Sequence, residues 1–131
     1  MDKFDDESIR EFLRINNLSE DNYFFATKSP LSVDYALFGY ASLVNYIVKF
    51  DYSKVYFFEL SRLSNKNIES CITVNIDEIK EIKEHSFIGI THNIKIVFTN
   101  KKTFVLQANK KIKQIEMQSE SLNSFIYELK K

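Results

Sequence analysis

The sequence predicts an α+β fold, a bent antiparallel barrel of about seven strands closed by a C-terminal helix and preceded by an extra N-terminal helix. Three observations lead to this prediction. Short segments that alternate apolar and polar residues, joined by polar turns, occupy most of the chain between residues 22 and 109. An apolar stripe of helical period precedes them, and a second such stripe follows them.

The first element is a helix over residues 5–16. Ile9, Phe12 and Leu13 follow the i, i+3, i+4 spacing of one helix face. Asp5 or Asp6 precedes this stripe, where an aspartate accepts a backbone N–H and suits the positive end of the helix dipole. We expect this helix to pack on the outside of the domain.

Residues 22–27 (NYFFAT) are predicted as the first strand. Ser29 and Pro30 then favour a helix start, with serine at the cap and proline at the first helical position. Gly39 ends such a helix early, so a short helix near 31–38 is expected, followed by a change to strand.

Residues 44–50 and 54–60 are predicted as a hairpin with the turn at residues 51–53. Tyr56, Phe58 and Leu60 point to one face of the second strand, and Val55 and Phe57 point to the other. A strand that is apolar on both faces is covered on both. The barrel interior is one cover, and the helix at 5–16 or the segment at 31–38 is the other.

The second half of the chain has the pattern of a meander ending in a helix. Residues 72–76 alternate, and the apolar spacing then changes to steps of three at Ile76, Ile79 and Ile82. A turn at 77–78 followed by a strand at 79–87 accounts for that change. Gly89 marks the next turn, residues 94–98 and 104–108 alternate around a tip at 100–102, and residues 119–131 carry the closing helical stripe.

Composition restricts the class of protein. At 131 residues, 44% of them hydrophobic and 15% aromatic, the chain has the material for one packed domain. Its formal net charge of zero argues against a nucleic-acid partner. Cys71 is the one cysteine, and the acidic start lacks the order of a signal peptide, so a reducing cytoplasm is expected. The longest nearly apolar stretch, residues 35–48, is shorter than the about 20 residues of a membrane span.

The pattern resembles the bacterial PH-like domains, which have the pleckstrin-homology superfold. The matching pieces are the hairpin YIVKFDYSKVYFFEL (46–60), the strand and corner ITVNIDEIKEIK (72–83), Gly89, the hairpin IKIVFTNKKTFVLQANKK (94–111) and the helix SESLNSFIYELKK (119–131). The resemblance implies a PH-like domain over residues 19–131, with residues 1–18 as a helical extension. It also implies a barrel with one end blocked by the helix, and a binding or scaffolding role without catalysis.

Two groups of residues are candidates for binding. Aromatic residues crowd the segment from 35 to 52, where they either pack in the core or form an apolar contact surface for a protein partner or a second copy. The candidates in this group are Tyr35, Phe38, Tyr40, Tyr46 and Tyr52. Lys101 and Lys102 at the hairpin tip are the alternative, a site for an anion or for the surface of a membrane. At about 3.3 Å per residue, the lysines at 110–113 lie roughly 25–30 Å from that tip and belong to no common patch.

Catalytic, metal and cofactor sites are not expected. His85, His92 and Cys71 are the residues that a small enzyme would use, but none has a base and an orienting acid at a recognisable spacing. Two histidines and one cysteine do not supply the about four ligands of a zinc site. Two glycines fifty residues apart cannot form a glycine-rich phosphate loop, so no cofactor is predicted.

Overall fold

The computed structural model describes residues 3–28, 44–61, 66–87 and 90–130. In chain order the elements are α1 (Asp6–Ile15), β1 (Tyr23–Lys28), β2 (Asn45–Phe50), β3 (Lys54–Leu60), β4 (Ile68–Asn75), the 3-10 turn η1 (Ile76–Glu78), β5 (Ile79–Phe87), β6 (Thr91–Phe98), β7 (Thr103–Asn109) and α3 (Gln118–Leu129). The predicted helix near 31–38 and the predicted turn at Gly89 lie outside the described residues.

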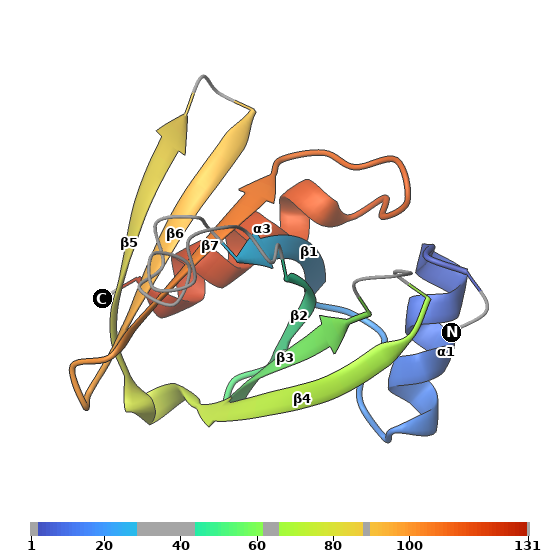
Figure 1. Ribbon diagram of the computed structural model, residues 1–131, viewed down its shortest axis with the longest axis horizontal. Helices are drawn as coiled ribbons and strands as arrows, with labels where there is room; N and C mark the ends of the chain where they lie inside the picture. The colour runs from blue at the N-terminus through green and yellow to red at the C-terminus, as the bar shows by residue number, and fades with distance from the viewer. Residues whose placement is uncertain (1–2, 29–43, 62–65, 88–89, 131) are drawn as a thin grey trace.

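The seven strands form one antiparallel sheet in the order β4-β3-β2-β1-β7-β6-β5. The sheet curls, and η1 leads the chain directly from one edge strand, β4, into the other, β5 (Figure 1). The two edges do not pair with each other along their length, so the sheet is not closed, and the predicted bent barrel is confirmed only as a curled antiparallel sheet of seven strands. The α+β class, the C-terminal helix and the extra N-terminal helix are confirmed.

Local sequence patterns placed several element boundaries correctly. The hairpin of β2 and β3 turns at residues 51–53, and Asp5 is the N-cap of α1, where its carboxylate accepts the Ser8 N–H at 2.9 Å. The step of three in the apolar spacing corresponds to η1, after which β5 begins at Ile79. β4 begins at Ile68, four residues before the predicted start, because its first residues pair with β3 while their side chains stay largely in solvent.

Both faces of the central strands are covered. Val55 and Phe57 of β3 face the interior of the curled sheet, where they belong to the same apolar cluster as Phe125 of α3. Phe58 and Leu60 face the outside and pack in a second cluster. That second cluster includes Ile9 and Leu13, the buried residues of α1, so the N-terminal helix is the outer cover that the apolar pattern required.

α1 is also held by polar contacts to the chain just before α3. The Asp6 carboxylate accepts hydrogen bonds from the Tyr23 hydroxyl at 2.5 Å and from the Glu116 N–H at 2.8 Å, and the Asp6 N–H donates to the Gln114 carbonyl at 3.1 Å. Burial and the neighbouring Asp6 carboxylate raise the pKa of Tyr23. Asp6 therefore connects three segments that are distant in sequence.

A buried lysine holds the connection between α1 and β1 against the outer face of the sheet. Lys49 of β2 is only 1% exposed. Its ammonium donates to the Ser19 hydroxyl at 2.8 Å, to the Asp21 carbonyl at 2.6 Å and to the Asp21 carboxylate at 3.2 Å. A buried charge is tolerated when its donors are satisfied in this way. Hydrogen bonds from Ser19 and Lys49 outweigh partial burial and keep the pKa of Asp21 below its usual range.

Gln118, the first residue of α3, joins β1 to β7 where their pairing stops. The two strands pair only at Thr27 with Gln107 and at Lys28 with Leu106. The same register, continued by two residues, would place Phe25 opposite Asn109. The buried Gln118 amide occupies that position, accepting from the Phe25 N–H at 2.9 Å and donating to the carbonyls of Phe25 at 2.9 Å and Asn109 at 3.0 Å. α3 is thus attached to the sheet by hydrogen bonds as well as by apolar packing.

Candidate functional site

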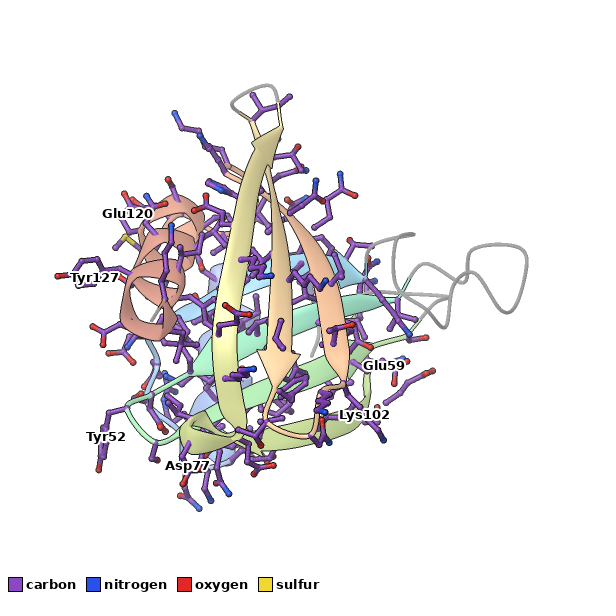
Figure 2. All side chains as sticks on the ribbon, turned by 90° about the vertical axis from the view of Figure 1, so that its left-hand side faces the viewer. Tyr52, Glu59, Asp77, Lys102, Glu120 and Tyr127 are labelled. Atoms are coloured by element: carbon purple, nitrogen blue, oxygen red, sulfur yellow. The ribbon has the colours of Figure 1, made fainter. Side chains whose placement is uncertain are left out.

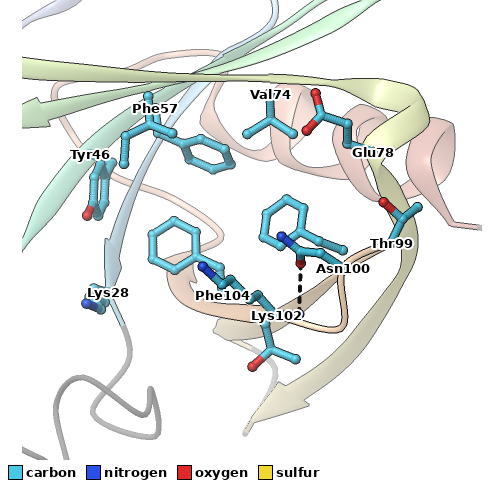
Figure 3. Close-up of a pocket in the computed structure, with 12 residues that line it drawn as sticks. Lys28, Tyr46, Phe57, Val74, Glu78, Thr99, Asn100, Lys102 and Phe104 are labelled. Atoms are coloured by element: carbon cyan, nitrogen blue, oxygen red, sulfur yellow. Dashed lines mark hydrogen bonds between the residues drawn. The ribbon is translucent and has the colours of Figure 1, made fainter.

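A cavity of about 370 Å³ opens between β4 and the β6–β7 hairpin, where the curled sheet is not closed. Figure 3 shows Val74 and Glu78 on one side of it and Asn100 and Lys102 on the other. We call this cavity the mouth, and its lining comprises Lys28, Tyr46, Phe57, Ile72, Val74, Glu78, Phe98, Thr99, Asn100, Lys102, Thr103 and Phe104. Its volume lies within the range of about 300–1,000 Å³ that is usual for ligand sites.

The floor of the mouth is aromatic and well packed. The rings of Tyr46, Phe57 and Phe104 meet edge to face, with centroids 6.3 Å apart for Tyr46 and Phe57, 5.5 Å for Tyr46 and Phe104, and 5.3 Å for Phe57 and Phe104. Such pairs add about 0.5–1.5 kcal/mol beyond the area they bury. The floor is therefore an apolar surface whose rings hold one another in place before any ligand arrives.

The hairpin tip forms one side of the rim. The Phe98 N–H donates to the Lys102 carbonyl at 2.9 Å, and the Asn100 side-chain oxygen accepts the Lys102 N–H at 2.9 Å (Figure 3). Lys101 takes a positive φ of 71°, which lets the chain reverse within these few residues. The turn places the Lys102 backbone beside the cavity and leaves Lys101 at the outer tip.

The other side of the rim is fixed by the corner between the two edge strands. The Glu78 carboxylate accepts the Asn75 N–H at 3.2 Å, so the one acidic side chain among the described lining residues is engaged within the chain. The Thr99 N–H donates to the Glu78 carbonyl at 2.9 Å and connects η1 to the hairpin tip. These bonds hold the two sides of the mouth at a set separation.

β4 contributes apolar side chains that are not fully covered. Ile72 and Val74 lie opposite Phe57 and Val55 of β3, so they share the inner face of the sheet. Val74 is half-buried against the core, whereas Ile72 is 53% exposed although it lines the mouth. An isoleucine that is half in solvent at the edge of an aromatic cavity is a feature typical of a contact site.

Among the described residues, the structure brings two of the predicted site residues together at the mouth and places Tyr52 apart from them. Tyr46 is buried in the floor of the mouth, and Lys102 lies on its rim. Lys101 is exposed at the adjacent tip. Figure 2 shows Tyr52 projecting on the side of α3, away from Lys102. Tyr35, Phe38 and Tyr40 lie outside the described residues.

Tyr52 is 96% exposed in the turn between β2 and β3. The turn is stabilised by Asp51, whose carboxylate accepts the N–H groups of Ser53 at 2.7 Å and Lys54 at 2.8 Å. Burial disfavours the Asp51 carboxylate, but these hydrogen bonds outweigh it and keep the pKa of Asp51 below its usual range. Tyr52 is thus displayed on an ordered turn at the end of the sheet that α3 covers.

Most of the mouth was missed by sequence reasoning, which assigned Phe57, Phe98 and Phe104 to strand faces only. One signal was available, since Phe98 and Phe104 flank the hairpin tip that carries Lys102. Residues close to a tip lie at the same end of a sheet as the tip itself. No local pattern indicated that Ile72 of β4 would face the same cavity.

The residues considered for catalysis lie elsewhere. His92 is buried on β6 with its Nδ1 in contact with the Glu84 carboxylate of β5, and neither residue lines the mouth. The Cys71 thiol is exposed, 3.7 Å from the Thr73 hydroxyl, and His85 pairs with Asn93 in the β5–β6 ladder. Within the described ranges, no group of three or more metal-ligating side chains comes together.

Comparison with known proteins gives no independent assignment, since the sequence matches no family model and no curated protein. In the part of the chain that the structure describes, neither α1 nor α3 is both long enough and apolar enough to cross a membrane.

Proposed function

We propose that this chain is a PH-like, non-catalytic binding module that recognises a protein partner at the mouth. The observation that carries the proposal is the cavity itself, which has an ordered aromatic floor, a half-exposed Ile72 and a lysine on its rim. The curled antiparallel sheet with a C-terminal helix against one end supports the PH-like assignment. Apolar cavities with a few polar groups at the rim are the usual form of a binding site.

The composition of the lining supports binding rather than catalysis. Among the described residues that line the mouth the acid–base groups are Glu78, Tyr46 and two lysines, there is no histidine, cysteine, serine or aspartate, and the Glu78 carboxylate accepts the Asn75 N–H at 3.2 Å. General acid–base and nucleophilic mechanisms need such groups within hydrogen-bond reach of each other. The described lining consists mainly of aromatic faces and neutral polar side chains, together with two lysines and Glu78.

Ile72→Asp is expected to weaken binding at the mouth at least tenfold, because it places a carboxylate at the edge of the aromatic floor. The probe is the anionic aromatic dye 8-anilinonaphthalene-1-sulfonate, titrated by fluorescence against the full chain. Ile15→Asp is the matched control, since Ile15 is 71% exposed on α1 and lies outside the mouth. Equal dye affinity in the Ile72→Asp and Ile15→Asp proteins would contradict the proposal. Urea unfolding of both variants verifies that each is folded.

A second copy of the chain is one form that the partner can take. Light scattering over a range of concentrations tests this directly. A mass that rises with concentration in the wild-type and Ile15→Asp proteins, and stays at one chain in Ile72→Asp, would identify the mouth as a self-association surface.

A membrane surface or free anion is the second candidate ligand, and the observation that favours it is the adjacency of Lys101 and Lys102 at the exposed tip. If the tip binds a membrane, the Lys101→Glu/Lys102→Glu double variant is expected to stop sedimenting with phosphatidylserine vesicles at low salt. Lys110→Glu/Lys111→Glu is the control, because β7 separates that lysine pair from the tip. Sedimentation equal in the wild-type and both double variants would exclude the tip as the membrane contact.

A further inference from the structure

The outer edge of β4 has backbone groups that pair with none of the described strands. The Ile76 N–H donates to the Ser53 carbonyl at 2.9 Å, which fixes the alternation of the β3–β4 ladder. In an antiparallel ladder every second residue bonds to the neighbouring strand. Val74, Ile72 and Ser70 therefore bond to β3, and the N–H and C=O groups of Cys71 and Thr73 point outward. Among the described strands, β3 is the one that pairs with β4.

The two free edges of the sheet differ in how well they exclude another strand. β5 carries Lys80, Glu81, Lys83 and Glu84 along its length, and charges of this kind discourage edge pairing. β4 has no charged side chain from residue 70 to residue 74. α3 also packs against β5, whereas β4 has no comparable contact with α1 or α3, the helices among the described residues. β4 is therefore the edge that accepts an added strand more readily.

The edge of β4 and the mouth form a single surface. Ile72 and Val74 lie on the inner face of β4 and line the cavity. Figure 3 shows Val74 at this position. A strand paired with β4 would place the residues opposite these two on the same inner face, since side chains directly opposite each other point the same way. Every second side chain of that strand would then enter the mouth.

We propose that the partner is an extended peptide segment that adds a strand to β4 and carries an apolar side chain into the mouth, with an acidic residue close to it. This proposal rests on the proposed function and specifies the kind of partner and how it binds. Backbone hydrogen bonds to Cys71 and Thr73 provide affinity, and the cavity selects the alternate side chains.

The rim charges select the acidic residue. Lys102 lines the mouth next to Lys101 at the exposed hairpin tip, and Glu78, the one acidic side chain among the described lining residues, accepts the Asn75 N–H. A carboxylate on the bound segment therefore meets the positive charge of these two lysines. Because this attraction acts at a solvent-exposed edge, we expect it to weaken as salt is raised.

Thr73→Pro is the variant that separates strand addition from binding in the cavity. The Thr73 N–H points to the free edge, so proline removes the outward donor and no bond to β3, and proline is tolerated on edge strands. The preceding residue, Ile72, is already extended, as proline requires. Thr73→Ala is the matched control, because it loses the same hydroxyl and keeps the N–H.

The probe is a phage-displayed library of random ten-residue peptides selected on the wild-type full-length chain. The expected result is enrichment of peptides with apolar residues at alternate positions and an aspartate or glutamate beside them. Synthetic copies of these peptides should bind the wild-type and Thr73→Ala proteins equally, and Thr73→Pro at least tenfold more weakly. Circular dichroism and urea unfolding confirm that both variants are folded.

The outcomes distinguish this inference from the function on which it rests. Peptides that bind Thr73→Pro as well as Thr73→Ala but lose affinity for Ile72→Asp would overturn strand addition and leave the mouth as the site. An absence of enriched peptides would overturn strand addition. Equal dye affinity in the Ile72→Asp and Ile15→Asp proteins would also overturn the assignment of the mouth as the binding site. If no peptide is enriched and phosphatidylserine vesicles bind the wild-type and Thr73→Pro proteins equally, the ligand is a membrane surface and not a peptide.

Discussion

Gln118→Leu is expected to lower the free energy of unfolding by about 3 kcal/mol. Leucine fills a similar volume but leaves the Phe25 N–H and the carbonyls of Phe25 and Asn109 without the hydrogen bonds that the amide provides. The site is buried, with Gln118 only 1% exposed, so water does not readily replace those bonds. An unsatisfied buried backbone group costs about 1–3 kcal/mol, and the three losses are not additive.

Urea unfolding followed by circular dichroism measures the change in free energy. Gln114→Leu is the matched control, because Gln114 is an exposed glutamine in the segment before α3 and should change stability by less than about 0.5 kcal/mol. Equal stability of the two leucine variants would show that the Gln118 amide does not join β1 to β7. A fall in the slope of the unfolding transition would show that α3 has separated from the sheet in the native state.

Phe125→Ala is expected to lower the free energy of unfolding by about 3–5 kcal/mol. Phe125 is fully buried on the inner face of α3, with its ring centroid 5.1 Å from that of Phe24 on β1 and 5.3 Å from that of Phe50 on β2. Alanine removes both edge-to-face contacts and leaves a cavity where the helix meets the curled sheet. The better helix propensity of alanine offsets only a few tenths of a kcal/mol.

Tyr127→Ala is the matched control, an aromatic-to-alanine change two residues further along the same helix. Tyr127 is 83% exposed and projects away from the sheet (Figure 2), so its loss should change stability by less than about 0.5 kcal/mol. The same urea measurement compares the two variants. A Phe125→Ala protein as stable as Tyr127→Ala would mean that α3 does not pack on the sheet as described.

The elements of this fold were predictable where one residue type recurs at one period. The stripe of Ile9 and Leu13 identified α1, and the alternation around residues 100–102 identified β6 and β7. The change of spacing between Ile76 and Ile79 located η1 and the start of β5. In each case the spacing of apolar residues indicates which face of the element is buried, and that spacing is visible within a short stretch of sequence.

The candidate site was predicted only in part. Tyr46 and Lys102 were selected for different reasons, one as a member of an aromatic run and the other as a hairpin lysine, and the mouth includes both. Ile72 and Phe104 were not selected, because an apolar residue on an alternating strand has the same pattern whether it faces a filled core or an open cavity. The difference depends on whether β4 and β5 meet, and that follows from the curl of the whole sheet.

Periodicity, turn residues and charge were enough to predict the class of fold, the order of the described helices and strands, and the need for a cover on each face of β3. They are local properties, set by backbone preference and by how often an apolar side chain returns to one face. Three features required the tertiary structure: the Gln118 amide between β1 and β7, the buried ammonium of Lys49, and the open edge of β4 beside the mouth. Each depends on polar or apolar groups that are far apart in the chain and become neighbours only when the sheet curls.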